Sequence, residues 1–146
     1  YTSIGRILIQ EHGLSIADVS MNKIKKWINN NPDMGNNLMN RNKSFVFFKI
    51  TENSKYGPTG SIGYPLTQLR SIAIDPMKNP MGFLYFINTV DSKYHKINRF
   101  VFAEDTGSAI KGQVRFDFFW GSGNESGLLA GKTNEKVIAW VILPNN

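Results

Sequence analysis

The sequence contains no cysteine and only two histidines, and these absences remove several kinds of chemistry. Without cysteine, the chain has no disulfides, no zinc–thiolate centre and no cysteine nucleophile. The two histidines, His12 and His95, lie far apart in the sequence. A histidine-rich metal site is therefore not expected, and a Ser-His-Asp triad would depend on one of these two residues.

Long apolar runs are also missing. No stretch of 18 or more apolar residues occurs, so no segment is expected to span a membrane. The first residue is Tyr1 rather than methionine, and no signal-peptide pattern follows it. We expect the chain to be a mature product, an excised piece or a fragment.

The residues that are present fit a folded protein of modest size. The chain has 146 residues, of which 41% are hydrophobic, enough for one domain or for one domain plus a piece of another. Seventeen Lys and Arg against 11 Asp and Glu give a net charge of +6, which favours a polyanionic partner such as nucleic acid, anionic lipid or acidic cell wall. The alternative is a basic domain with solvated lysines, since only Lys23, Lys25 and Lys26 are clustered.

Residues 1–42 are predicted to be mainly helical. Ser20 is typical of a helix N-cap, and apolar residues then recur at helical spacing, at Met21, Ile24, Trp27 and Ile28. The asparagines at 29–31 are expected to end this helix. Asn31 before Pro32 indicates an N-cap with proline at the first position of a further helix.

From residue 44 onward the pattern predicts strands and a mainly β fold. Short β-branched and aromatic stretches alternate with glycine and proline turns, which favours a barrel or a sandwich. The predicted strands are Ser44–Ile50, Ser71–Ile74, Phe83–Ile87, Arg99–Ala103, Val114–Phe119 and Val137–Leu143. One short helix is expected within residues 121–131.

Three aspartates, Asp75, Asp105 and Asp117, lie in or at the ends of predicted strands. Acidic residues are disfavoured inside strands, so each must be solvated, paired or functional. Asp75 before Pro76 is typical of a turn. Asp105 is equally compatible with a tight turn and with a site, because Gly107 lets a ligand approach the backbone and Lys111 can meet an anionic group.

Asp117 is the strongest candidate for chemistry. Strand alternation is expected to turn Val114, Phe116, Phe118 and Trp120 toward a core, leaving Arg115, Asp117 and Phe119 on the other face. Aromatic surfaces stack on sugar rings, and a partly desolvated carboxyl is suited to proton donation. A purely structural Arg115–Asp117 pair is the alternative.

These residues carry a resemblance to a known family. The stretch VFAEDTGSAIKGQVRFDFFWGSG resembles the C-terminal barrel of the membrane-bound lytic murein transglycosylase A family. The blocks YTSIGR, SFVFFKI, GPTGSIGYPLTQLRSIAIDP and VIAWVILP are similar to that family in the same order. The barrel region also resembles the three-aspartate domain, with Asp75, Asp105 and Asp117 as the three positions.

The resemblance implies a double-psi β-barrel that cleaves the β-1,4 bond between N-acetylmuramic acid and N-acetylglucosamine and leaves a 1,6-anhydromuramyl end. It implies that Asp117 is the catalytic acid and then the base, with Asp105 in the same site and no cofactor or metal. The implied substrate-binding residues are Asp75, Gly107, Ser108, Ala109, Lys111, Phe119, Trp120 and Gly121. The implied location is the periplasmic face of the bacterial outer membrane.

The chain departs from the family in length, because members are more than twice as long. Residues 1–42 are similar to the tail of an inserted second domain, and residues 43–146 to the C-terminal part of the barrel. The missing N-terminal half is therefore expected in cis or in trans, with the glycan groove between the two domains. A smaller departure is Ser108, where a second glycine is common.

Two other functions are compatible with the sequence. One is a non-catalytic module that binds peptidoglycan through Phe119, Trp120 and its basic charge. The other is a basic nucleic-acid-binding barrel, which the dispersed lysines and the three aspartates argue against. We therefore expect peptidoglycan strands, and no nucleic acid, as the partner.

Overall fold

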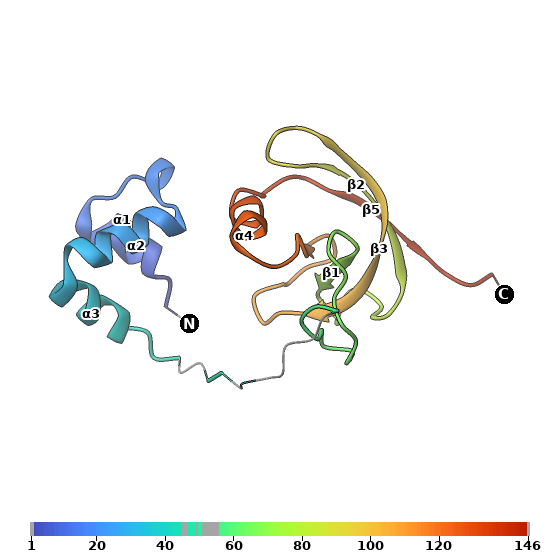
Figure 1. The fold of residues 1–146 in the computed structure, drawn as a ribbon, viewed down its shortest axis with the longest axis horizontal. Helices are drawn as coiled ribbons and strands as arrows, with labels where there is room; N and C mark the ends of the chain where they lie inside the picture. The colour runs from blue at the N-terminus through green and yellow to red at the C-terminus, as the bar shows by residue number, and fades with distance from the viewer. Residues whose placement is uncertain (1, 45–46, 49, 51–55, 146) are drawn as a thin grey trace. The chain divides into compact units, whose positions relative to one another are not determined.

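The computed structural model describes residues 2–44, 47–48, 50 and 56–145. Its contacts divide the chain into two units, residues 1–51 and residues 52–146. The first unit is helical and the second is built on a sheet, as Figure 1 shows. Each unit has its own cluster of buried apolar side chains.

The first unit contains three α-helices and a single 3₁₀ turn, Ile16–Asp18, within the described residues. The helices are α1 (Ile4–His12), α2 (Met21–Asn30) and α3 (Pro32–Asn40). Ile7, Leu8 and Leu38 form the buried core of this unit, and Ile24 and Trp27 pack against it.

Local side-chain chemistry sets two of these helix boundaries as the sequence predicts. The Ser20 hydroxyl accepts a hydrogen bond from the amide of Lys23 at 3.3 Å, which confirms the N-cap of α2. Pro32 opens α3, as predicted. Asn31 is the N-cap residue of α3, also as predicted, but its side chain makes no capping hydrogen bond there. Its Nδ2 instead donates to the carbonyl of Trp27 at 2.9 Å, so its side chain closes α2.

The second unit is organised around one five-stranded sheet with the order β4-β1-β3-β2-β5. β1 runs parallel to β3, and the other neighbouring strands are antiparallel. The one described helix of this unit is α4 (Asn124–Ala130), which lies between β4 and β5 in the sequence. The strands are β1 (Ser71–Ile74), β2 (Leu84–Val90), β3 (Lys96–Thr106), β4 (Asp117–Phe118) and β5 (Ile138–Ile142).

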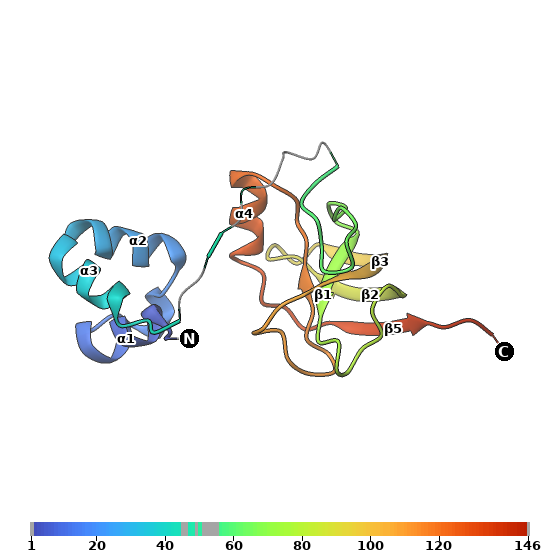
Figure 2. The same cartoon turned by 90° about the horizontal axis from the view of Figure 1, so that it is seen from below.

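One face of this sheet carries the core. Alternate residues of β1, β2 and β3 pack together there with Trp120, and Leu129 of α4 lies against them. Figure 2 shows α4 to one side of the strands. The buried members of this cluster are Ile72, Ile74, Tyr85, Ile87, Ile97, Val101, Ala103 and Trp120.

The opposite face of β2, β3 and β5 carries an exposed aromatic row. Phe86 is paired with Phe100 on one side and with Trp140 on the other, with ring centroids 5.2 and 5.8 Å apart. Phe100 and Trp140 are each 50% exposed, so this row is an apolar surface rather than a second core.

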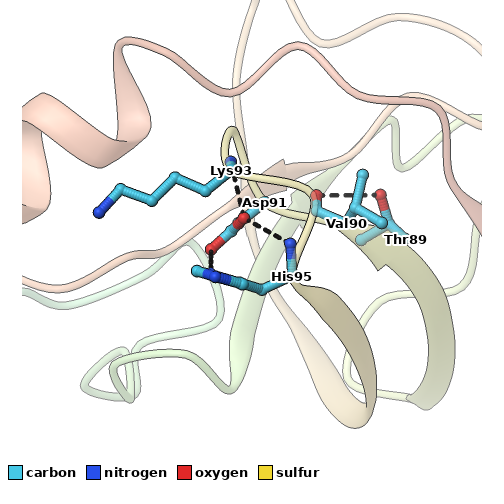
Figure 3. Close-up of polar contacts among 5 residues, drawn as sticks. All are labelled: Thr89, Val90, Asp91, Lys93 and His95. Carbon is cyan, nitrogen blue, oxygen red and sulfur yellow. Dashed lines mark hydrogen bonds and ion pairs between the residues drawn. The ribbon is translucent and has the colours of Figure 1, made fainter.

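Asp91 organises the turn between β2 and β3 (Figure 3). Its carboxylate accepts hydrogen bonds from the amides of Lys93 and His95, and it lies 2.9 Å from the imidazole Nδ1 of His95. Burial raises the pKa of Asp91, but these donors outweigh it and hold the pKa below its ordinary value. The turn thereby fixes the register of the longest hairpin in the described chain.

The structure confirms the mainly β fold behind a helical segment and corrects several element boundaries. The predicted strand 44–50 is wrong where it can be judged, since residues 44, 47, 48 and 50 are not in a strand, while 45, 46 and 49 lie outside the described residues. Phe47 and Phe48 are 90% and 93% exposed, so nothing pairs or packs them into a sheet. The strand predicted at 114–119 is reduced to β4.

The sheet is open in the described residues, because β4 and β5 are its two edges and do not pair with each other. The expected barrel is therefore present as a curved sheet and not as a closed cylinder. The predicted helix in 121–131 is confirmed as α4.

Candidate active site

Two of the three aspartates lie in one row across the sheet, on either side of β1. Ala73 of β1 is paired with Asp105 of β3 and with Asp117 of β4. Residues paired across neighbouring strands point to the same face of a sheet. Strands are about 4.8 Å apart, so the α-carbons of the two aspartates are separated by roughly 9.5 Å. The small methyl group of Ala73 lies between them.

A β-bulge brings Asp105 into this row. Ile72 is paired with Ala103, whereas Ala73 is paired with Asp105, so Glu104 is an extra residue on β3. Regular alternation from the buried Ala103 would turn Asp105 toward the core. The bulge reverses the alternation at this point and turns Asp105 away from the core.

Both carboxylates line one hollow of about 230 Å³. Its walls include Leu66, Ile110 and Phe119 as well as the two aspartates. Ligand sites commonly combine such apolar walls with a few polar groups that fix orientation. The hollow therefore has the composition of a binding site for a molecule with both apolar and polar surface.

Asp117 is accessible and pairs with Arg115. The Nε of Arg115 donates to Oδ1 of Asp117 at 2.9 Å, and the two side chains are 56% and 51% exposed. The core-facing half of the predicted alternation is confirmed for Phe116, Phe118 and Trp120. It is wrong for Val114, which is 58% exposed, because β4 does not extend that far.

The other carboxylate of the row, Asp105, is held by a residue that the sequence reasoning missed. Oδ1 of Asp105 accepts hydrogen bonds from the amide of Ser61 at 3.1 Å and from its hydroxyl at 2.7 Å. In the sequence, Ser61 stands between Gly60 and Gly63 and carries only a turn signal. No local pattern connects residues 44 positions apart.

The remaining predicted residues are distributed around the site. Ser108 and Ala109 are exposed in the loop after β3. A Cβ added at Gly107 would lie 2.9 Å from the end of the Ile110 side chain, so Ile110 would have to shift to admit it. Gly121 has a φ of 115°, and a Cβ there would lie 2.5 Å from Gln68. Trp120 is 8% exposed and belongs to the core, so its ring is not available as a stacking surface.

Asp75 does not line the hollow, and its carboxylate binds the backbone. Oδ2 accepts a hydrogen bond from the amide of Gly112 at 2.9 Å, and Oδ1 accepts one from Met77 at 3.2 Å. Lys111 Nζ is 3.9 Å from Oδ1. The Gly112 amide is the main cause that holds the pKa of Asp75 below its usual range, although burial opposes it.

This geometry makes Asp75 a source of pH-dependent stability. We expect Asp75→Asn to lower Tm by several degrees at pH 7, because an amide cannot accept both backbone hydrogen bonds. The folded-state pKa is lowered, so the contribution is fully present above the unfolded value of about 3.9 and is lost as pH falls through the folded value. Thermal unfolding from pH 7 to pH 2 should show the two proteins converging at acid pH. A pH-independent difference in Tm would contradict this role.

The described residues contain neither a cluster of metal-ligating side chains nor a helix suited to span a membrane. Over residues 2–44, 47–48, 50 and 56–145, no group of three or more His, Cys, Asp or Glu side chains is placed to hold a metal ion. None of the helices in these ranges is both long enough and apolar enough to cross a bilayer.

Comparison with known protein families assigns both units. Residues 70–143 match the 3D domain, and residues 1–49 match the MltA specific insert domain. The first match covers the whole sheet with Asp75, Asp105 and Asp117, which places this unit in the three-aspartate, double-psi β-barrel class. The chain belongs to the membrane-bound lytic murein transglycosylase A family.

Individual relatives agree with this assignment. The chain is 36% identical to the membrane-bound lytic murein transglycosylase A homolog of Buchnera aphidicola and 34% identical to the Escherichia coli K12 protein of that name, over 97% of its length. The crystal structure of MltA from Neisseria gonorrhoeae matches with a TM-score of 0.88 at 38% identity, covering 99% of this chain and 37% of that one. E. coli MltA with bound chitohexaose matches with a TM-score of 0.82 at 33% identity, covering 97% and 43%. The chain spans 40% of the length of these curated relatives.

Proposed function

We propose that this chain carries the catalytic carboxyl of a peptidoglycan lytic transglycosylase, with Asp117 as general acid and then base and Asp105 as the supporting carboxylate. The observation that carries the proposal is the pairing of both aspartates with Ala73 over one hollow. The names of the relatives, and the sugar chain bound in the E. coli structure, support the substrate class.

The reaction needs one carboxyl that changes its protonation state. Asp117 gives its proton to the oxygen that joins C1 of N-acetylmuramic acid to C4 of N-acetylglucosamine, and the C1–O bond breaks. The C6 hydroxyl oxygen of the same muramyl residue then bonds to C1, and Asp117 takes the hydroxyl proton. The products are a free 4-hydroxyl and a 1,6-anhydro ring, and the acid is regenerated. Intramolecular attack makes water unnecessary and gives the hydroxyl a large effective concentration.

The contacts around the two carboxylates suit these roles. Arg115 occupies Oδ1 of Asp117, and no described residue hydrogen-bonds its Oδ2, which leaves that oxygen for the proton. Asp105 is one strand beyond Ala73 and is placed to stabilise positive charge that develops at C1. We assign glycan contacts to Phe119 in the hollow and to Gly107, Ser108, Ala109, Lys111 and Gly121 around it.

Digestion of purified sacculi tests the reaction. Mass spectrometry of the soluble products should show muropeptides with 1,6-anhydro ends. Products with ordinary reducing ends would sink the assignment, because they require attack by water. Co-sedimentation with sacculi without any product would favour the alternative, a non-catalytic module that binds peptidoglycan.

The proposal extends to a partner segment and a location. The relatives contain further sequence beyond the part matched here. We propose that residues 43–146 form the C-terminal part of the barrel, and that the N-terminal half of the barrel enzyme is supplied in cis or in trans. Residues 1–42 are assigned to the tail of the inserted domain. The exposed row of Phe86, Phe100 and Trp140 supports an additional polypeptide covering the sheet. We propose the periplasmic face of the outer membrane as the location, and the relatives' names, which call them membrane-bound, support an association with a membrane.

A further inference from the structure

Residues 58–66 form a compact hairpin next to the candidate site, here called the Ser61 loop. Thr59 and Pro65 form a β-bridge, the amide of Gly60 donates to the carbonyl of Tyr64 at 2.8 Å, and the amide of Leu66 donates to Pro58 at 2.7 Å. The loop lies between residues 1–49 and 70–143, so neither matched family domain includes it.

The Ser61 loop is held against the bulged end of β3. The amide of Ile62 donates to the carbonyl of Glu104, the extra residue of the bulge, at 3.3 Å. A Cβ at Gly60 would lie 2.4 Å from the same carbonyl oxygen, so this close approach requires glycine. A β-bulge disrupts the hydrogen bonds between neighbouring strands. Here the Ser61 loop supplies a donor to the Glu104 carbonyl, the group that the bulge leaves unpaired.

Ser61 makes four hydrogen bonds to the two residues that follow the bulge. Its amide and its hydroxyl both reach Oδ1 of Asp105, and its Oγ accepts from the amide of Thr106 at 3.1 Å. The Oγ atoms of Ser61 and Thr106 are 2.8 Å apart. Because a carboxylate only accepts, the Ser61 hydroxyl proton points to Asp105, and the Thr106 hydroxyl is therefore the donor to Ser61. One proton arrangement satisfies all four bonds.

The consequence is an asymmetric Asp105 carboxylate. Oδ1 receives both donors of Ser61, whereas Oδ2 has no hydrogen-bond partner among residues 2–44, 47–48, 50 and 56–145. We propose that Ser61 is a positioning residue of the active site, which fixes the rotation of Asp105 so that Oδ2 faces the bound sugar. This inference rests on the proposed function, because the role of Ser61 is to orient Asp105, the supporting carboxylate of the proposed reaction.

The hydroxyl of Ser61 is tested by paired substitutions. Ser61→Ala removes the Oγ contacts but keeps the amide donor, and it is expected to lower kcat on sacculi roughly tenfold, the cost of one hydrogen bond to a charged group. KM should change less than about twofold, because the supporting carboxylate acts mainly on the transition state. Ser61→Thr keeps the hydroxyl and should retain at least half of the wild-type kcat.

Two further measurements separate positioning from folding and from the proposed function. Ser20→Ala, which removes the N-cap of α2, should lower Tm but should not show the loss of kcat expected for Ser61→Ala. The carboxyl carbon resonance of Asp105 should shift in Ser61→Ala and not in Ser61→Thr, whether or not the protein turns over. An unchanged Asp105 resonance, or equal loss of kcat in both Ser61 variants, overturns the proposal. Inactive wild-type protein with the expected resonance shifts would count against the reaction and leave the Ser61 contact supported.

Discussion

Asp117→Asn is expected to abolish release of anhydromuropeptides, with kcat reduced by about 10²- to 10⁴-fold, the range for loss of a general acid. Asparagine keeps the size of the side chain and still accepts a hydrogen bond from Arg115, so the strand pairing of β4 should persist. Binding to sacculi should be nearly unchanged. The measurement combines mass spectrometry of the released products with co-sedimentation, and both use the full chain that the gene encodes.

Asp33→Asn is the matched control for this substitution. Asp33 is an exposed residue in the first turn of α3, and the same chemical change there should leave turnover at the wild-type rate. Circular dichroism and Tm establish that both variants fold. Full activity in a folded Asp117→Asn protein would falsify the catalytic assignment.

Ala73→Leu is expected to lower kcat/KM by about 100-fold for a steric reason. The added carbons extend from β1 into the space between Asp105 and Asp117, which is where the proposed function puts the scissile bond. A displacement of the substrate by roughly 1 Å is enough for a loss of that size. Both carboxylates remain intact in Ala73→Leu, so the loss arises from the space that the leucine takes from the substrate. Unlike the loss in Asp117→Asn, it should therefore come with weaker binding to sacculi.

Two variants serve as controls for Ala73→Leu. Ala73→Ser adds a single atom and should retain most of the activity, and Ala130→Leu makes the same enlargement at the exposed end of α4. Ala73 is buried, and enlarging a buried residue can also cost about 1–3 kcal/mol of stability, so Tm is measured alongside. Wild-type kinetics in Ala73→Leu would mean that the sugar does not pass over this row.

Much of the fold follows from local patterns. β1, β2, β3, β5 and α4 are found close to where alternation and turn residues predict them, and Ser20 caps α2 as expected. The stretch 44–50 has an aromatic, β-branched composition, but strand formation depends on a partner. Exposed Phe47 and Phe48 have none in the described residues, so composition alone was misleading there.

The candidate site was predictable in its residue types but not in its geometry. Asp105 and Asp117 stand out because carboxylates are costly among strand residues. Alternation along β3 would still have placed Asp105 with Ala103 on the core side, because a bulge has no reliable local signature. Ser61 and Ala73 were missed for a related reason: each owes its position to pairing with residues distant in the sequence.

The bulge also affects how this family can vary in length. Since Glu104 is the supernumerary residue, a chain lacking it would bring Ala103 and Asp105 into uninterrupted pairing with Ile72 and Ala73. The two carboxylates would stay in the same row, and only the Glu104 contacts with Ser71 and Ile62 would disappear. A one-residue gap at this point in an alignment is therefore compatible with an intact row of Asp105 and Asp117. An insertion or deletion between Ser71 and Ala73 would instead change the register of β1, the strand with which both aspartates pair.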